Sequence, residues 1–224
     1  MFLKWGSQPW MIWRSHWRNR QMLGGRRVTF AILTAMGLFA AIPYTLIDRF
    51  ASIRDWAAFD PTLQLDIDIP FLAWMILPYM TLYLYYPVAA WLGSKNEIMW
   101  RQNIVFHQMM LLTCWGVNLI FILLPVEIDL RHLIHGIEGT MWEPFYASMH
   151  AIDTPWNSWP SLHIVQSMQV VFVLRYWYPP TTSRLRIAHV LLLIMWIMLV
   201  ISTMTIKQHY VWDVATAMLV AGLT

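Results

Sequence analysis

Five long runs of this sequence contain no Lys, Arg, Asp or Glu, and each is long enough to cross a bilayer as a helix. About 20 helical residues span the ~30 Å hydrocarbon core of a membrane. A sixth apolar run contains Asp213 and extends only about 25 Å as a helix, which is marginal for a crossing. The sequence therefore predicts an all-α, polytopic membrane protein with a six-transmembrane-helix bundle. The predicted spans are Val28–Ile47, Ile69–Ser94, Gln102–Val126, Thr154–Leu174, Ile187–Ile206 and a last one from near Gln208 to Thr224.

Composition supports a membrane protein and argues against a disulfide-stabilised one. Only 12% of the residues are charged, against about 25% in typical soluble domains. Cys114 is the single cysteine, so no intrachain disulfide can form.

The positive charges indicate the orientation in the membrane. With six spans and a cytoplasmic N-terminus, the cytoplasmic segments contain eleven of the 15 Lys and Arg residues. Loops rich in Lys and Arg stay in the cytoplasm. We therefore expect an integral protein of a bacterial inner membrane or an equivalent membrane, with a cytoplasmic N-terminus.

The first 27 residues differ from the rest because they are basic and rich in tryptophan. Trp side chains alternate with Arg side chains, a pattern typical of segments that lie on an anionic membrane surface. A disordered basic tail is the alternative. We divide the chain into an interfacial segment, residues 1–27, and a six-helix domain, residues 28–224.

Two stretches far apart in the sequence carry residues suited to chemistry. His209 and Asp213 are four residues apart, so on a helix they share one face, where the carboxylate can orient the imidazole. The second stretch ends in Pro160-Ser161-Leu162-His163. Prolines prevent a helix there, and Ser161 can cap the helix that His163 enters. The pair of His209 and Asp213 lies between two apolar runs, and a charged pair at that depth is costly and therefore a functional candidate. Under the predicted topology both histidines lie at the outer ends of their spans.

These motifs resemble the type 2 phosphatidic acid phosphatase superfamily. That superfamily has a Pro-Ser-x-His motif, then a Ser followed by His after seven residues and Asp after four more. Ser202, His209 and Asp213 keep this spacing. The surrounding residues are most similar to the branch that contains inositol phosphorylceramide synthases, and sphingomyelin synthases share a similar His-Tyr-x-x-Asp-Val element.

The resemblance implies a role for each matching residue. His209 would attack phosphorus and form a phosphohistidine, Asp213 would orient it, and His163 would protonate the leaving oxygen. Such chemistry needs positioning, charge stabilisation and an activated nucleophile. No metal or other cofactor is implied, and no nucleic acid partner.

The motif that supplies a Lys and an Arg in the family is absent here, and Thr203 replaces the Arg after the motif Ser. Arg131 and Lys207 are our candidates for binding phosphate in its place. Further substrate- or phosphate-binding candidates are Ser161, Ser202, Asn157 and Asp153, although Asn157 and Asp153 could equally form turns.

The resulting functional hypothesis is a membrane-embedded lipid phosphatase or phosphotransferase whose active site is extracytoplasmic. Its substrate would be a phospholipid, sphingolipid or isoprenoid phosphate or pyrophosphate. Hydrolysis is slightly favoured over the transfer of a phospho-head-group to a lipid alcohol. A non-catalytic lipid-binding protein that keeps the fold is a third possibility.

Overall fold

The computed structural model describes residues 8–54 and 58–224, and within these ranges the chain forms helices and loops without a β-strand. In order, the elements are η1 (Met11–Trp13), α2 (Arg14–Arg18), α3 (Met22–Gly25), α4 (Arg27–Met36), η2 (Gly37–Ala41), α5 (Ile42–Ile53), α6 (Gln64–Asp68), η3 (Ala73–Met75), α7 (Ile76–Met80), α8 (Leu82–Leu92), α9 (Glu97–Leu123), η4 (Arg131–Leu133), α10 (Glu143–Ile152), α11 (Leu162–Trp177), α12 (Ser183–Thr205) and α13 (Val211–Leu223).

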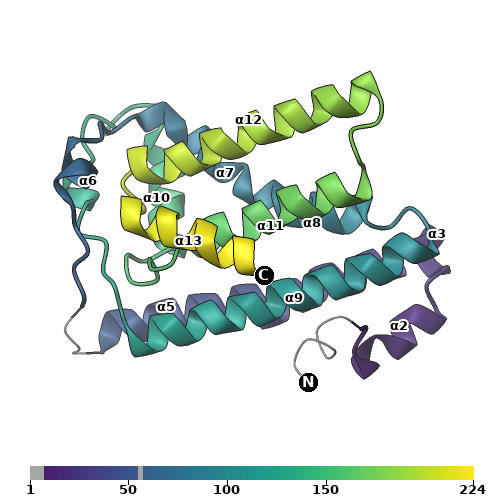
Figure 1. Ribbon diagram of the computed structural model, residues 1–224. Coiled ribbons are helices and arrows are strands. Elements are labelled where there is room, and N and C mark those ends of the chain that lie inside the picture. The colour runs from purple at the N-terminus through teal and green to yellow at the C-terminus, as the bar shows by residue number, and fades with distance from the viewer. Residues whose placement is uncertain (1–7, 55–57) are drawn as a thin grey trace.

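The long helices run along one common direction, and the loops gather at two ends of the bundle (Figure 1). We call the end where α5, α9 and α12 terminate and α11 and α13 begin the site end. The opposite end holds α2, α3 and the loops that join α8 to α9 and α11 to α12. Both predicted site histidines therefore lie at the same end.

Three helical stretches are long and apolar enough to cross a membrane, which indicates an integral membrane protein. They are Arg27–Ile53, Glu97–Leu123 and Ser183–Thr205, and Val211–Leu223 is a shorter apolar helix. The other two predicted spans are helical but interrupted or short, because α7 and α8 are separate segments and α11 has 16 residues, about 24 Å. The structure thus has three helical stretches that are long enough to span a membrane, whereas the sequence predicted six spans.

Prolines explain where the apolar runs depart from regular helix. Pro43 follows the π-helical turn η2, which absorbs the missing backbone hydrogen bond inside the span Arg27–Ile53. The run predicted from Thr154 becomes helical only at Leu162, because Pro155 and Pro160 lack the amide hydrogen that a helix requires.

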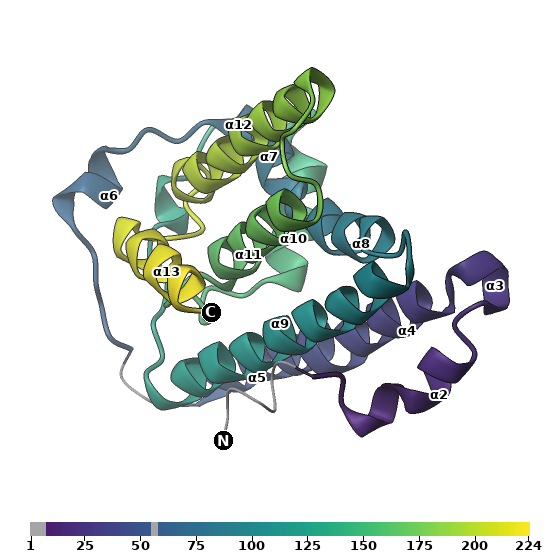
Figure 2. The ribbon, with the colours of Figure 1, turned by 45° about the vertical axis from the view of Figure 1, so that its right-hand side comes forward.

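Helix α11 is the centre of the bundle. It packs against α8, α9, α12 and α13, and Figure 2 shows it surrounded by them. Most of its residues are buried, including His163 in its first turn. The helix that begins with the Pro-Ser-Leu-His motif is thus held on several sides, which fixes the position of the imidazole.

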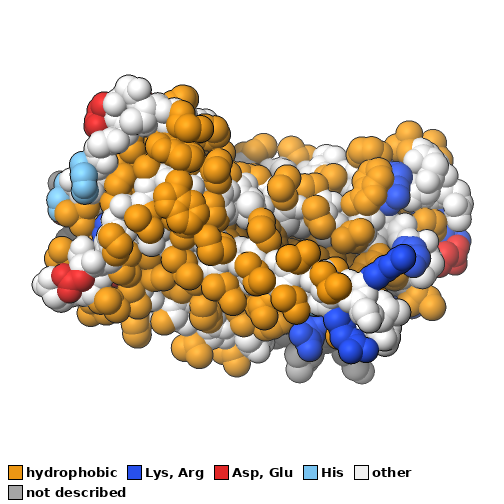
Figure 3. Space-filling view, turned by 90° about the horizontal axis from the view of Figure 1, so that it is seen from above, with side chains coloured by type: hydrophobic (Ala, Val, Ile, Leu, Met, Phe, Trp, Pro, Cys, Tyr) orange, Lys and Arg blue, Asp and Glu red, His pale blue; other side chains and the backbone are white. Residues whose placement is uncertain are grey.

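The surface is divided into an apolar middle and charged ends. In Figure 3 hydrophobic side chains cover most of the visible face. Lys and Arg side chains gather toward one end, and the visible His side chains lie at the other end. Exposed residues of α12 such as Ile187, Leu191 and Ile194 belong to this apolar surface. A face of this kind fits a lipid environment, because large exposed apolar areas are rare on soluble monomers.

The basic N-terminal segment is docked on the bundle. The amide of Trp10 donates to Oε1 of Gln108 at 2.8 Å, and Nε2 of Gln108 donates to the carbonyl of Gln8 at 2.9 Å. Trp13 is only 5% exposed. Because Gln108 lies eleven residues into α9, residues 8–13 contact that helix about 16 Å from its beginning. Residues 1–7 of the predicted interfacial segment lie outside the described ranges.

Candidate active site

The two histidines, 46 residues apart in sequence, are in direct contact. Nε2 of His209 lies 3.1 Å from Nδ1 of His163. His209 is 3% exposed and sits in the loop between α12 and α13, while His163, 9% exposed, is the second residue of α11. The structure therefore brings the two sequence motifs together at the site end of the bundle.

Asp213 lies on the other side of His209 and orients its ring. Its Oδ2 atom is 3.2 Å from Nδ1 of His209 and accepts the backbone N–H of Tyr210 at 3.0 Å. The carboxylate accepts a hydrogen bond from Nδ1–H of His209, so the hydrogen-bond network assigns the lone pair of that ring to Nε2, which faces His163. Ser161 donates its amide to the Asp213 carbonyl at 3.3 Å, which joins α13 to the start of α11.

Two tyrosines that we did not select from the sequence complete the network beyond His163. The hydroxyl of Tyr79 lies 3.1 Å from Nε2 of His163 and donates to Oδ2 of Asp153 at 3.3 Å. Tyr44 donates to Oδ1 of Asp153 at 2.7 Å. The only sequence signal for them was a polar hydroxyl inside an apolar run, which several other tyrosines share. Asp153, 3.7 Å from Nε2 of His163, can stabilise a protonated imidazole.

Arg131 places a cation beside this network. Its Nη2 donates to the Asp153 carbonyl at 2.7 Å and to Oε1 of Gln208 at 3.2 Å. Burial lowers the pKa of Arg131 from its usual value, and Asp153 acts in the opposite direction. A guanidinium stays protonated at neutral pH despite such shifts. Its Nε is buried and has no partner among the residues that the structure describes, so the group keeps a donor for an anion.

Lys207, a candidate for binding phosphate, is surrounded by backbone acceptors in the structure. It is 1% exposed, and its Nζ donates to the carbonyls of Asp66 and Ile69 at 2.7 and 2.6 Å. The side chain of Asp66 in turn accepts the amide of Val211 at 2.7 Å. Lys207 thus ties the segment around α6 to the start of α13. Burial lowers the pKa of its ammonium group, and Asp66 opposes this.

Replacing Lys207 by Met should destabilise the protein more than it affects chemistry. Two buried carbonyls would lose their donor, at a cost of about 2 kcal/mol or more in the free energy of unfolding. We expect a lower thermal midpoint and unchanged phosphorylation of His209 per folded molecule. The exposed Lys95 at the opposite end, changed to Met, is the matched control. Loss of phosphorylation at an unchanged midpoint would instead assign Lys207 to the phosphate.

The remaining predicted residues surround the network with different contacts. Ser161 is fully buried and its hydroxyl has no partner in residues 8–54 and 58–224, so it can donate to a substrate. Nδ2 of Asn157 donates to the carbonyl of Tyr44 at 3.2 Å, which positions that tyrosine's turn of helix. The hydroxyl of Ser202 donates to the carbonyl of Leu199 at 2.6 Å within α12. Its hydrogen is therefore already in a hydrogen bond inside the helix.

His150, which contacts Gln208 beside the network, should make stability depend on pH. Its Nε2 accepts from Nε2 of Gln208 at 3.3 Å, and burial, then the charge of Arg131, lowers its pKa to about 4. An unfolded histidine has a pKa near 6.5, so the unfolded chain binds more protons between these values. Stability should fall by up to about 2 kcal/mol from pH 7 to pH 5 through this group, because solvent screening of the half-buried ring lowers the full value. Thermal midpoints of His150→Gln should show a correspondingly smaller decrease, whereas equal slopes would contradict this.

An apolar cavity of about 320 Å³ reaches the network from the side of the bundle. It lies between the α4–α5 stretch, α8 and α11, and its lining includes His163, Asp153 and Tyr44. In residues 8–54 and 58–224, no group of three or more His, Cys, Asp and Glu side chains is arranged to hold a metal ion. The arrangement of histidines and carboxylates suits nucleophilic and acid–base chemistry carried out by side chains.

Comparison with known families points to the same chemistry. Residues 130–224 match the PAP2 superfamily model. The matched range contains Arg131, His163, His209 and Asp213. The PAP2 superfamily consists of phosphatases and phosphotransferases, so the match supports an activity of that type. No curated protein and no solved structure matched the chain.

Proposed function

We propose that this protein is a membrane-embedded lipid phosphatase or phosphotransferase that works through a phosphohistidine on His209. One observation carries the proposal: an imidazole held by Asp213 directs its free Nε2 at a second imidazole, 3.1 Å away. An oriented nucleophile and a neighbouring acid are the components that covalent phosphoryl transfer needs. The PAP2 match over residues 130–224 agrees with this assignment.

In the proposed first step, Nε2 of His209 attacks phosphorus and the bond from phosphorus to the leaving oxygen breaks. His163, protonated on both nitrogens, gives its Nδ1 proton to that oxygen and becomes neutral. Its Nε2–H is held by the oxygen of Tyr79, whose hydroxyl donates to Asp153. In the second step water or an alcohol attacks phosphorus, the P–N bond breaks, and His163 takes the proton of the attacking hydroxyl.

The contact between the histidines must open when substrate binds. Reacting atoms approach to about 3–3.5 Å before bond formation, so a phosphoryl group cannot enter between nitrogens that remain 3.1 Å apart. We assign the stabilisation of its charge to Arg131, whose Nε lacks a partner, and to the free hydroxyl of Ser161. Asn157 and Asp153 act as positioning residues, and Ser202 and Lys207 support the structure of the surrounding loops.

A lipid is the proposed substrate because the route to His163 is apolar. The 320 Å³ cavity is lined mainly by hydrophobic side chains of membrane-facing helices. We propose six spans, with the short helices α11 and α13 and the broken pair α7–α8 completing the bundle. The positive-inside distribution of Lys and Arg then puts the site end on the extracytoplasmic face.

The decisive experiment is to trap a phosphate on His209. Purified full-length protein would be mixed with labelled phosphatidic acid or an isoprenyl pyrophosphate, then quenched in alkali, where phosphohistidine survives. We expect labelled His209 and release of inorganic phosphate. Phosphate release without any labelled histidine, under conditions that trap a known phosphohistidine, would rule out the covalent route.

The transfer of a phospho-head-group to a lipid alcohol is the second candidate, and the position of Lys207 favours it. Because two carbonyls hold that ammonium group, the site offers fewer cations to a highly charged phosphate than our sequence analysis assumed. A phosphodiester carries less charge and suits Arg131 alone. Transfer of a head group to ceramide or diacylglycerol, with no phosphate release from lipid phosphates, would establish this function and the inositol phosphorylceramide synthase-like branch.

A further inference from the structure

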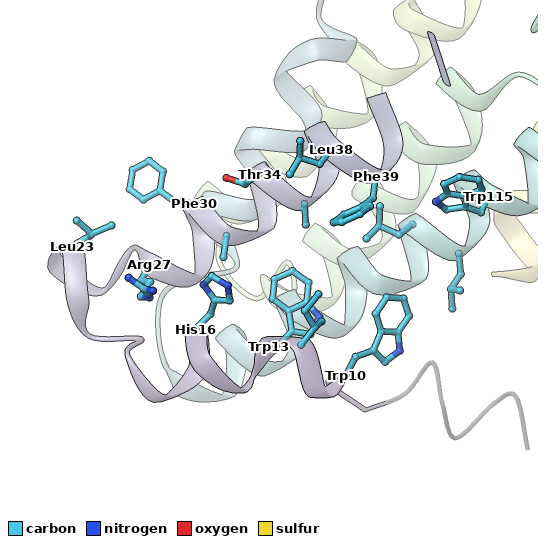
Figure 4. A pocket seen from close by; sticks show the side chains of 15 residues that line it. Trp10, Trp13, His16, Leu23, Arg27, Phe30, Thr34, Leu38, Phe39 and Trp115 are labelled. Atoms are coloured by element: carbon cyan, nitrogen blue, oxygen red, sulfur yellow. The ribbon is translucent and has the colours of Figure 1, made fainter. Parts of the chain in front are cut away.

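A groove that carries unpaired donors lies away from the histidines, between the N-terminal segment and the bundle. Its volume is about 570 Å³, within the usual range of ligand sites. η1 and α2 form one wall, and α4 and α9 form the others (Figure 4). We propose that this groove binds one anionic phospholipid, in the leaflet opposite the proposed active site.

Nitrogen donors without partners gather in the groove. Nε of Arg27, Nδ1 of His16 and Nε1 of Trp13 are buried, and within the described part of the chain none has a hydrogen-bond partner. Arg27 and Trp13 always donate from these atoms, and His16 does so when its proton is on Nδ1. The contact of Arg27 with Met22 is a weak one, from Nη1 to sulfur at 3.8 Å. Among residues 8–54 and 58–224, Arg27 has no ion-pair partner, and no residue that lines the groove is acidic. Buried donors are costly unless an acceptor is supplied, so the groove is complementary to an anion.

The rest of the groove fits an acyl chain that starts at this anion. Figure 4 shows Arg27 and His16 at one end of the groove and Leu38, Phe39 and Trp115 toward the other. Arg27 and Leu38 are eleven residues apart along one helical stretch, which corresponds to about 16 Å. That length is about half of the ~30 Å hydrocarbon core, the depth of one leaflet. A lipid could therefore place its phosphate at the polar end of the groove and an acyl chain at the apolar end. Free phosphate would fill only the polar end.

The neighbouring arginine supplies a matched control. The guanidinium of Arg26 lies 3.8 Å over the ring of Trp91, and its Nη1 donates to the Trp91 carbonyl at 3.1 Å. Its charge equals that of Arg27 at almost the same height of the bundle, but it faces α8. If a lipid were bound only by the overall positive charge of this end of the bundle, replacing Arg26 and replacing Arg27 would lower its affinity equally.

The test is an equilibrium titration of the purified full-length protein in non-ionic detergent, followed by native mass spectrometry. Phosphatidylglycerol, phosphatidylcholine with the same chains, and inorganic phosphate are the three probes. We expect phosphatidylglycerol to bind best and Arg27→Gln to weaken it about tenfold or more, the effect of losing a charged hydrogen bond. Arg26→Gln should leave its affinity within about twofold. Ala35→Trp, which fills the groove but keeps Arg27, should also weaken the lipid.

Three outcomes would overturn the proposal. Equal binding of both lipids would show that no anion is recognised, and equal loss in the two arginine variants would show only surface charge. Inorganic phosphate binding as tightly as the lipid would identify a free-anion site. The thermal midpoint of each variant without lipid shows whether that variant is folded. If Arg27→Gln does not fold, the lipid affinity of Ala35→Trp tests the proposal in its place. None of these results depends on phosphorylation of His209, so this site and the proposed function can fail separately.

Discussion

His209→Asn is expected to abolish phosphoryl transfer, with a loss in kcat on the order of 10⁴-fold or more. The change removes the nucleophilic nitrogen, and the buried site offers no other imidazole that Asp213 orients. Asn keeps a polar side chain that can still accept or donate within the loop, which limits structural damage. The measurement is kcat with saturating lipid phosphate, together with the amount of alkali-stable phosphate on the protein.

His132→Gln serves as the control for this variant. His132 is exposed near the site end of the bundle, on the loop that also carries Arg131, so its loss should leave both readouts within about twofold. If His209→Asn retained lipid turnover, phosphorus would be attacked by another group. If the wild type showed no turnover or adduct with any lipid phosphate, and His209→Asn kept its lipid binding, the protein would be a non-catalytic lipid binder.

The second large effect should come from His163→Ala and should depend on the leaving group. General acid catalysis contributes about 10²–10⁴-fold, and a lipid alkoxide needs that proton more than a phosphate leaving group does. We therefore expect phosphorylation of His209 to fall by about 10³-fold with a lipid monophosphate. With a lipid pyrophosphate of the same chain, the decrease should be about tenfold. Single-turnover rates of adduct formation measure both.

Tyr86→Phe provides the comparison for the leaving-group test. Its hydroxyl donates to Oε1 of Gln166 at 2.8 Å in the same cavity, so its removal should change both substrates by similar factors. Equal losses for the two substrates in His163→Ala would mean that His163 only positions His209. The acid would then have to be another group of the network.

Several features of the fold could be predicted from local sequence alone. The uncharged runs predicted helices because backbone groups in a membrane must be satisfied within the segment, and α9 and α12 lie within or close to the predicted ranges. Pro155 and Pro160 predicted the non-helical approach to His163. Such effects depend on residues that are neighbours in the chain, so the sequence states them directly.

Contacts between distant segments were beyond this reasoning. Tyr44 and Tyr79 join the site because α5 and α7 bring their hydroxyls to Asp153, whereas Tyr86 of the same apolar run as Tyr79 donates to Gln166. Lys207 looked like a phosphate ligand from its position in the motif. The folded chain gives its ammonium group to the carbonyls around α6, because a segment more than 130 residues earlier packs there.

The sequence by itself determined which side chains are available for the chemistry, because the motifs that contain His163, His209 and Asp213 are made of neighbouring residues. It did not determine how His209 meets Asp213, because His209 lies in the loop before α13 and not on one helix with Asp213. Only the tertiary structure decided that His163 contacts the His209 imidazole, that Tyr79 joins His163 to Asp153, and that backbone carbonyls bind Nζ of Lys207 while Arg131 lies beside the network. The physical reason is that helical periodicity is encoded within a few residues, whereas the packing of α11 against four other helices is a property of the whole bundle.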